Sequence, residues 1–284
     1  MKPFELPFQI FKILDQGYHI AVTVYINALP ARLLIDSGAS HSVFDKSRIS
    51  YFLPNFQVNE SPLMAMGMGD DLEPFLLKVR DFEIGKRKFP KYQATLLDLS
   101  ALNQIYSRFY DEPIHGILGC DLLMKLKANL SYKKKTLKWK DWKKPFQVRS
   151  VAPGAEHLMA TLKIQKQKAN MLIDTGSSST IFDLNLFKQF YHYEAQQLKR
   201  SDQPSAGIAS TAQSFGSVTI PRLTIGPIGL TNHEMLFIDL EHINSLYAKL
   251  GLPPIDGLLG NDLLFMLQAS LNFKSKCLRL PLSS

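Results

Sequence analysis

Two segments of the chain follow one pattern, and each carries an aspartate in surroundings suited to a reactive carboxylate. Residues 33–45 read LLIDSGASHSVFD, and residues 171–183 read MLIDTGSSSTIFD. In both, an apolar run typical of a buried strand leads into Asp-Ser/Thr-Gly, small polar residues, an apolar pair and a second aspartate. Asp36 and Asp174 therefore hold equivalent places in two copies of one unit. This equivalence predicts one shared site built from both copies.

The chemistry expected of such a pair is acid–base catalysis. Gly38 and Gly176 allow the chain to turn tightly after each aspartate and bring backbone N–H groups against the carboxylate. If a pseudo-twofold axis relates the copies, the two carboxylates face each other, and like charges that close share one proton. Such a pair can deprotonate a water while it donates a proton to a carbonyl oxygen. This reaction needs no metal, no cofactor and no covalent intermediate.

The repeat extends far beyond the two aspartates. GILGCDLL at 116–123 matches GLLGNDLL at 257–264, and ANLSYKKKTLKW at 128–139 matches ASLNFKSKCLRL at 269–280. Ahead of the GILG/GLLG motif, each copy has apolar residues spaced i, i+3, i+4 and i+7, which predicts an amphipathic helix. These residues are Leu102, Ile105, Tyr106 and Phe109 in the first copy and Ile243, Leu246, Tyr247 and Leu250 in the second. Four aligned blocks in one order indicate a tandem duplication.

The fold expected from this repeat is two mostly β domains, each with one or two short helices. Asp98 and Asp239 precede the amphipathic helices and are expected to cap their free N–H groups. A second, shorter helix is expected after each GILG/GLLG motif. The repeat places domain 1 at 1–140, a linker at 141–150 and domain 2 at 151–284. Alternation of apolar and polar residues predicts half-buried strands, of which the clearest are 19–26, 75–84, 136–140 and 217–225.

Together these motifs resemble those of retropepsin-like aspartic proteases, in particular the bacterial aspartyl protease domains. The shared pattern is apolar-apolar-Asp-Thr/Ser-Gly-Ala/Ser, a Gly-containing region and Ile/Leu-Leu-Gly-x-Asp, and it covers both halves nearly end to end. The resemblance implies tandem β-barrel domains related by a pseudo-twofold axis. It also implies an aspartic endopeptidase with Asp36 and Asp174 as its catalytic dyad. Retropepsins usually build this site from two identical subunits, whereas here two fused copies would build it in one chain.

The resemblance also implies roles for residues next to the dyad. Ser37 and Thr175 match the hydroxyls that cross-link the two active loops, which are the segments that begin at the aspartates. Gly119 and Gly260 match the glycines that support these loops from beneath. The residues assigned to the active loops and their support are Ser37, Gly38, Thr175, Gly176, Ser177, Gly119 and Gly260.

Two flaps that close over a substrate would map to MAMGMGDD at 64–71 and SAGIASTA at 205–212. Both segments are Gly-containing and poor in bulky anchors, as a mobile hairpin tip should be. An ordinary surface hairpin is the alternative interpretation of each segment. The residues assigned to the flaps and to substrate binding are Met66, Gly67, Met68, Gly69, Gly207, Ile208 and Ala209.

The two active loops are not identical. Ala39 follows the first Asp-Ser-Gly, while Ser177 follows the second Asp-Thr-Gly. A serine hydroxyl at that place could donate a hydrogen bond to its aspartate and favour the ionised form. This leads to the hypothesis that Asp174 carries the charge of the dyad and Asp36 carries the proton.

Two histidines near the motifs are expected to have no catalytic role. His115 stands before the first GILG motif, where the second copy and the resembling family have an aspartate, Asp256 in this chain. His41 follows closely after the first Asp-Ser-Gly. We expect both to be ordinary loop residues, and no His/Cys cluster has the spacing of metal ligands.

Composition sets further bounds. A hydrophobic content of 45% with 20% charged residues is an ordinary globular balance. Residues 1–20 read as a first strand and lack a signal-peptide core, and the apolar stretches are too short to span a bilayer. We therefore expect a cytoplasmic protein that does not contact a membrane. Cys120 and Cys277 are expected to be reduced, because their counterparts in the repeat are Asn261 and Thr136.

Three alternatives to an internally paired peptidase are open. The net charge of +8 and the segment KKKTLKWKDWKK at 133–144 suggest nucleic-acid binding, but a strand with a solvated lysine face explains the segment better, and no nucleic-acid partner is expected. A catalytically silent peptide- or protein-binding module of the same fold is the second alternative. The third is that the halves pair between chains, since a linker of about ten residues can span some tens of ångströms. The preferred interpretation is a monomer with an internal pseudo-dimer that hydrolyses peptides or proteins lying extended against the flaps.

Overall fold

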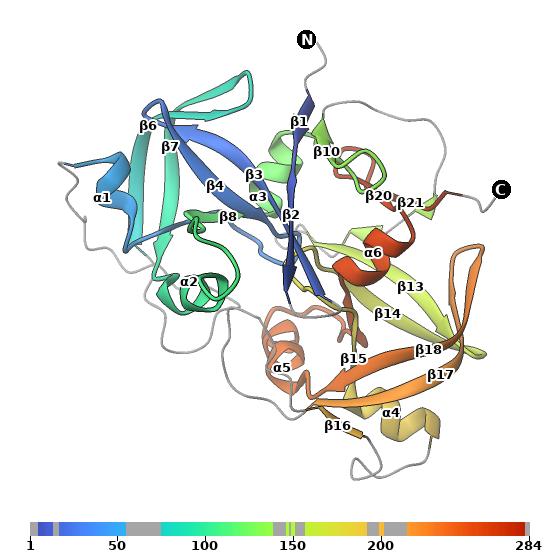
Figure 1. Ribbon diagram of the computed structural model, residues 1–284. Helices are drawn as coiled ribbons and strands as arrows, with labels where there is room; N and C mark the ends of the chain where they lie inside the picture. Colours follow the sequence, from blue (N-terminus) through green and yellow to red (C-terminus); the bar gives the residue numbers. More distant parts are fainter. Residues whose placement is uncertain are drawn as a thin grey trace.

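Two similar halves make up the molecule, and strands from both meet in one shared sheet (Figure 1). The structure is a computed structural model, and it describes residues 5–13, 17–54, 75–138, 146–147, 149–150, 157–191, 199–201 and 215–281. In Figure 1 the first half runs from blue to green and the second from yellow to red, and the two lie side by side. The predicted fold class, mostly β with tandem barrels and short helices, is confirmed.

Six strands of the first half close into a barrel. In order around the barrel they are β3 (Gly17–Ile26), β4 (Leu29–Ile35), β8 (Gly116–Leu118), β5 (Val43–Asp45), β7 (Arg87–Leu97) and β6 (Phe75–Ile84). β6 pairs back with β3, with Phe82 opposite Ile26, and this pairing closes the barrel. Asn27 and Gly85 make two of the connecting turns with positive φ angles of 48° and 59°. The strands predicted at 19–26 and 75–84 are therefore confirmed.

The second half repeats this barrel strand for strand. Its order is β13 (Leu158–Ile164), β14 (Gln167–Ile173), β19 (Gly257–Leu259), β15 (Ile181–Asp183), β18 (Ile228–Ile238) and β17 (Phe215–Ile225). β17 pairs back with β13, with Ile225 opposite Leu162. Three short strands extend the two barrels, namely β2 (Gln9–Ile13) beside β3, β12 (Arg149–Ser150) beside β13 and β16 (Lys199–Ser201) beside β17.

A third sheet takes strands from both halves. Its antiparallel strands are, in order, β1 (Glu5–Pro7), β10 (Thr136–Lys138), β9 (Asn129–Ser131), β20 (Ser270–Asn272), β21 (Cys277–Arg279) and β11 (Phe146–Gln147). At its centre β9 pairs with β20, with Leu130 opposite Leu271, and these leucines are equivalent residues of the repeat. Backbone hydrogen bonds therefore join the two halves within one chain.

The segment predicted as a linker, 141–150, contains two of these short strands. Phe146–Gln147 pairs with β21 as Glu5–Pro7 pairs with β10, and Arg149–Ser150 extends the second barrel. Each half supplies its own edge strand to the shared sheet, so we propose that the second domain begins at Phe146. The first predicted strand is likewise divided into β1 and β2, because the N–H of Phe8 between them donates to the Lys135 carbonyl at 3.0 Å.

Within the described residues, each half carries three short helices. Two pairs match the prediction, namely α2 (Ser100–Tyr106) with α5 (Glu241–Lys249) and α3 (Cys120–Lys125) with α6 (Asn261–Met266). Asp98 and Asp239 accept the N–H of the first residue of α2 and α5, both at 2.8 Å, so the predicted capping is confirmed. The sequence pattern does not indicate the third pair, α1 (Ile49–Phe52) and α4 (Leu184–Tyr191). Helix α1 is a single turn that buries Ile49 and Phe52. One turn is too short to produce a recognisable helical periodicity in the sequence.

The apolar core is continuous across the two halves. One cluster of buried residues includes Leu130 and Leu271 in the shared sheet together with Phe44 of the first barrel and Phe182 of the second. Cys120 and Cys277 are buried free thiols, as predicted. Among the described residues, the helices are too short or too polar for any of them to cross a membrane.

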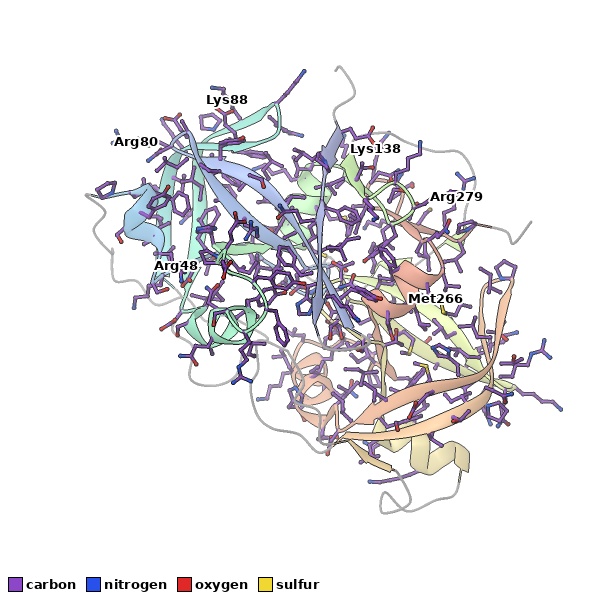
Figure 2. The ribbon with its side chains drawn as sticks, viewed as in Figure 1. Arg48, Arg80, Lys88, Lys138, Met266 and Arg279 are labelled. Atoms are coloured by element: carbon purple, nitrogen blue, oxygen red, sulfur yellow. The ribbon has the colours of Figure 1, made fainter. Side chains whose placement is uncertain are left out.

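The lysine-rich segment contributes to the shared sheet. Lys133, Lys134 and Lys135 lie exposed in the turn before β10, and β10 itself pairs with β1 and β9. Figure 2 labels basic side chains from several different parts of both halves, namely Arg48, Arg80, Lys88, Lys138 and Arg279. The exposed lysines therefore lie in the turn, Thr136 and Leu137 of β10 are buried, and residues 139–144 of the segment lie outside the described residues.

Candidate active site

The two aspartates follow directly after equivalent barrel strands. β4 and β14 each pair in parallel with the strand of the GILG/GLLG motif, β8 or β19. Just beyond these pairs, Asp36 donates its N–H to the Leu118 carbonyl and Asp174 donates its N–H to the Leu259 carbonyl, both at 3.0 Å. The motif strands therefore hold the backbone of each aspartate at the point where the chain leaves the barrel.

Backbone N–H groups orient both carboxyl groups. Oδ1 of Asp36 accepts hydrogen bonds from the N–H of Gly38 at 2.8 Å and of Ala39 at 3.0 Å. Oδ1 of Asp174 accepts the two equivalent N–H groups at 2.8 and 3.2 Å. The tight turn expected after each aspartate is therefore present, and its donors favour an ionised carboxylate.

Each loop glycine lies against the carboxyl group of the opposite half. A Cβ on Gly38 would lie 2.5 Å from Oδ1 of Asp174, and a Cβ on Gly176 would lie 2.3 Å from Cγ of Asp36. These separations are too short for any side chain, so only glycine leaves room for the facing carboxyl group. The structure thereby brings Asp36 and Asp174 together across the interface between the halves.

The two carboxyl groups interact as a pair. Burial raises the pKa of Asp174 well above its usual range, and the charge of Asp36 and a side-chain hydrogen bond with Asp36 raise it further, while the N–H groups of Gly176 and Ser177 oppose the shift. The raised pKa favours the protonated form of Asp174, so it does not support the charge that the Ser177 hypothesis placed on Asp174. The expected bond from the Ser177 hydroxyl to Asp174 is not formed, because this hydroxyl donates to the Ser179 carbonyl at 2.7 Å within its own loop.

Four hydrogen bonds cross-link the two active loops. Thr175 Oγ1 accepts the N–H of Ser37 and donates to the Ile35 carbonyl, both at 2.9 Å. In return, Ser37 Oγ accepts the N–H of Thr175 at 3.1 Å and donates to the Ile173 carbonyl at 2.7 Å. Both hydroxyls are buried. The structure thus contains the bonds that the assigned role of Ser37 and Thr175 requires.

Gly119 and Gly260 lie directly beneath the active loops. A Cβ on Gly119 would lie 2.6 Å from the carbonyl carbon of His41, and the Gly119 N–H donates to Ser42 Oγ at 2.8 Å. Gly260 makes the equivalent contacts under the second loop, where an added Cβ would lie 2.3 Å from the Ser179 carbonyl oxygen. The geometry fits the supporting role expected of both glycines.

Comparison with known protein families agrees with this geometry. A family model described as aspartyl protease matches the chain twice, over residues 22–122 and 160–263. The two matches together span more than half of the chain. The chain belongs to the aspartyl protease family. Each half is one copy of the family domain, so the predicted fusion of two retropepsin-like copies is confirmed.

Two solved structures are similar to the chain at low identity. A retropepsin-like aspartic protease from Rickettsia conorii is 17% identical, with a TM-score of 0.29, over 45% of this chain and 86% of that one. Conglutin gamma, a basic 7S globulin from lupine seeds, is 11% identical, with a TM-score of 0.44, over 92% of this chain and 90% of that one. No curated protein matches the chain. The family assignment therefore rests on the double match to the family model.

The support beneath the two aspartyl protease loops differs between the halves. Cys120 Sγ donates to the Ser37 carbonyl at 3.2 Å, whereas the equivalent Asn261 donates through Nδ2 to the Thr175 carbonyl at 2.7 Å. Asn261 Oδ1 also accepts the hydroxyl of Tyr132, which belongs to the first half. The second loop is therefore tied to the shared sheet by a polar contact. Alignment of the two copies shows that Asn261 replaces Cys120, but it does not show that Tyr132 bonds to Asn261.

An aspartate–asparagine pair in each half, buried in the first half and partly buried in the second, fixes the motif strands, and the sequence analysis did not identify it. Asn103 of α2 donates to Asp45 at 3.0 Å and exchanges two hydrogen bonds with the backbone of Ile114, at 2.9 and 2.8 Å. Asn244 of α5 donates to Asp183 at 3.2 Å and makes the equivalent backbone exchange. The available signal was that the two asparagines, like the two aspartates, occupy equivalent places in the repeat.

His115 and Asp256 perform the same structural task. His115 Nδ1 accepts the N–H of Arg32 at 3.1 Å, and Asp256 accepts the N–H of the equivalent Asn170 at 2.7 Å. Burial is the main cause that lowers the pKa of His115 to about 4, so the imidazole is neutral and can act as an acceptor. This contact explains how a histidine replaces the aspartate of the other half, and it agrees with the loop role predicted for His115.

The remaining predicted residues fall into two groups. The flap segments at 64–71 and 205–212, with all seven flap residues assigned in them, lie outside the described residues. His41 is exposed on the first active loop, with its Nδ1 3.0 Å from Ser40 Oγ. Across the part of the chain that the structure describes, there is no cluster of three or more His, Cys, Asp or Glu side chains suited to hold a metal ion.

Proposed function

We propose that the protein is an aspartic endopeptidase whose dyad is built jointly by its two halves. The observation that carries this proposal is the cross-packing of Gly38 and Gly176 against the opposite carboxyl groups of Asp174 and Asp36. Membership of the aspartyl protease family gives independent support. Both aspartates keep part of their surface accessible, as groups that act on a substrate must.

The proposed reaction divides the acid and base roles between the aspartates. In this proposal Asp36 takes a proton from a water molecule that attacks the carbonyl carbon of the peptide bond. Asp174, as the protonated member, gives its proton to the carbonyl oxygen. The tetrahedral intermediate then collapses as the dyad delivers a proton to the amine nitrogen and the C–N bond breaks. Buried Ser37 and Thr175 hold the two loops in register throughout.

The proposal is tested by cleavage of a diverse peptide library from about pH 4 to 8 with the wild-type protein and with Asp36→Asn and Asp174→Asn. Because each aspartate supplies an acid or a base in the transition state, we expect each substitution alone to reduce turnover by at least about a hundredfold. Circular dichroism of each variant establishes that the fold is retained. Absence of turnover by the folded wild-type protein at every pH would instead favour the catalytically silent peptide-binding module.

A further inference from the structure

Each half contains a histidine–tyrosine pair outside the dyad. His19 at the start of the first barrel meets Tyr106 of α2, and His157 just before β13 meets Tyr247 of α5. The two histidines are equivalent in the repeat, as are the two tyrosines. The sequence analysis assigned both tyrosines only to the apolar stripes of their helices.

The geometry of the two pairs is nearly the same. The rings are stacked, with centroids 5.7 Å apart and 21° between the planes for His19 and Tyr106, and 6.3 Å and 22° for His157 and Tyr247. In each pair the tyrosine hydroxyl is hydrogen-bonded to Nδ1 of the histidine, at 3.0 Å in the second half. Burial raises the pKa of both tyrosines, so each hydroxyl stays protonated. The hydroxyl therefore donates to Nδ1, which leaves the imidazole proton on Nε2.

This arrangement leaves a buried donor in each half. Within the described residues, Nε2 of His19 and Nε2 of His157 are buried and have no hydrogen-bond partner. Buried polar groups are almost always paired with protein or with ordered water, so an unpaired one calls for a specific explanation. The explanation differs between the halves because the surroundings of the two imidazoles differ.

The first-half imidazole is buried in the protein core, whereas the second-half pair is less buried and interacts electrostatically with the two aspartates. His19 is 2% exposed, and burial by itself accounts for the lowered pKa of its imidazole. His157 is only half-buried. Burial is the largest cause that lowers the pKa of its imidazole, while the charge of Asp36 raises this pKa and His41 lowers it. Both of these groups belong to the active loop of the other half. The pKa of Tyr247, which is hydrogen-bonded to the imidazole, is raised by burial and then by the charge of Asp174.

The strands that begin near these histidines reach the active loop of the opposite half. At the start of β3, the N–H of Tyr18 donates to the Ser178 carbonyl in the second active loop at 3.3 Å. The residue equivalent to Tyr18 lies at 156, outside the described residues, and from the pseudo-twofold relation we infer that His157, next to it, lies near the first active loop, which carries Asp36 and His41. The backbone path therefore agrees with the electrostatic contact between His157 and that loop.

We propose that His157, held in one tautomer by Tyr247, is a positioning residue for the dyad whose Nε2–H donates through a bound water toward Asp36. This inference rests on the proposed function, since it concerns Asp36, one member of the proposed catalytic pair. A neutral imidazole supplies a fixed donor without placing a second charge beside the aspartates. The three groups that act on the imidazole are Asp36 and His41 from the first active loop and Tyr247 from α5.

The first test reads the imidazoles directly and does not depend on turnover. The imidazole ¹H and ¹⁵N resonances of His157 and His19 are recorded by NMR from pH 5 to 8 in the wild-type protein and in Asp36→Asn. Loss of the Asp36 charge should shift the His157 resonances and lower the pKa of that imidazole, while His19 serves as the internal control and stays unchanged. If the substitution leaves His157 unaffected, or shifts both histidines alike, the inference is overturned.

The second test compares Tyr247→Phe with Tyr106→Phe, which make the same chemical change in the two pairs. Tyr247→Phe frees the His157 ring and should move the acid limb of the kcat/KM pH profile upward by about half a pH unit or more. Tyr106→Phe should leave the pH profile in place. Equal shifts in the two variants, or no shift in either, would contradict a positioning role. If the wild-type protein shows no turnover, the proposed function fails, and the NMR result still decides whether His157 contacts Asp36.

Discussion

At the scale of single residues, the site depends on small side chains as much as on the two aspartates. Gly38 and Gly176 leave the space that the facing carboxyl groups occupy, and Gly119 and Gly260 leave the space for the loops above them. The catalytic proposal therefore makes a prediction about positions that carry no reactive group.

Gly176→Ala is expected to abolish turnover while the protein remains folded. The added methyl group would lie 2.3 Å from Cγ of Asp36, so that carboxyl group must move away from Asp174. Misplacement of a reacting group by about 1 Å can reduce the rate by about a hundredfold. The matched control is Gly229→Ala in β18, where an added Cβ meets no atom within 4 Å. Equal kcat values for the two variants would show that close packing of the dyad does not matter.

At the scale of secondary-structure elements, polar contacts fix the strands that carry the site. Asn103 connects α2 to Asp45 at the end of β5 and to Ile114 ahead of β8, and Asn244 makes the same connections in the second half. β8 and β19 in turn hold the backbone of the two aspartates. These helices therefore position the motif strands through two asparagines that do not touch the dyad.

Asn103→Ala should lower the free energy of unfolding by about 2 to 4 kcal/mol, because it leaves buried polar groups of Asp45 and Ile114 without their partner. Ser107→Ala at the end of the same helix is the control, since its hydroxyl bonds to the Gln104 carbonyl at the surface. Urea unfolding followed by circular dichroism measures both values. A cost for Asn103→Ala no larger than that for Ser107→Ala would contradict the anchoring role.

At the scale of the whole molecule, buried neutral histidines link folding to pH. His19 is the clearest case, because burial lowers its pKa from 6.5 to about 4. The folded state disfavours the imidazolium, so the stabilisation is complete above pH 6.5 and is lost as the pH falls toward 4. Asp174 and other buried carboxyl groups with raised pKa values act in the opposite direction. The contribution of His19 must therefore be isolated with a variant.

Between pH 7 and pH 4, the wild-type protein should lose about 3 kcal/mol more stability than His19→Gln, which does not titrate in this range. The free energy of unfolding is measured in urea at a series of pH values for both proteins. The prediction concerns the difference between the two slopes, so it does not depend on the absolute cost of the substitution. Parallel curves would show that His19 does not contribute to acid sensitivity.

The sequence predicts the repeat and the pair of aspartates because both are encoded in local patterns that occur twice, whereas the barrels are expected from the resemblance to retropepsin-like proteases. It does not predict contacts between residues far apart in the chain, such as Tyr132 with Asn261, which are 129 positions apart, or His19 with Tyr106, which are 87 apart. The prediction for the Ser177 hydroxyl is wrong for a different reason. A nearer acceptor, the Ser179 carbonyl, competes with the aspartate, and only the folded loop shows which acceptor the hydroxyl meets.

The most direct test of a dyad built within one chain is complementation between its two single variants. Asp36→Asn and Asp174→Asn are unfolded together, refolded as a mixture, and assayed for peptide cleavage beside each variant alone. Because β9 and β20 pair the two halves of the same chain, each molecule in the mixture should carry one aspartate and one asparagine, and no turnover should return. Turnover well above the sum of the separate variants would show that halves from different chains form the site, and it would contradict an internal dyad.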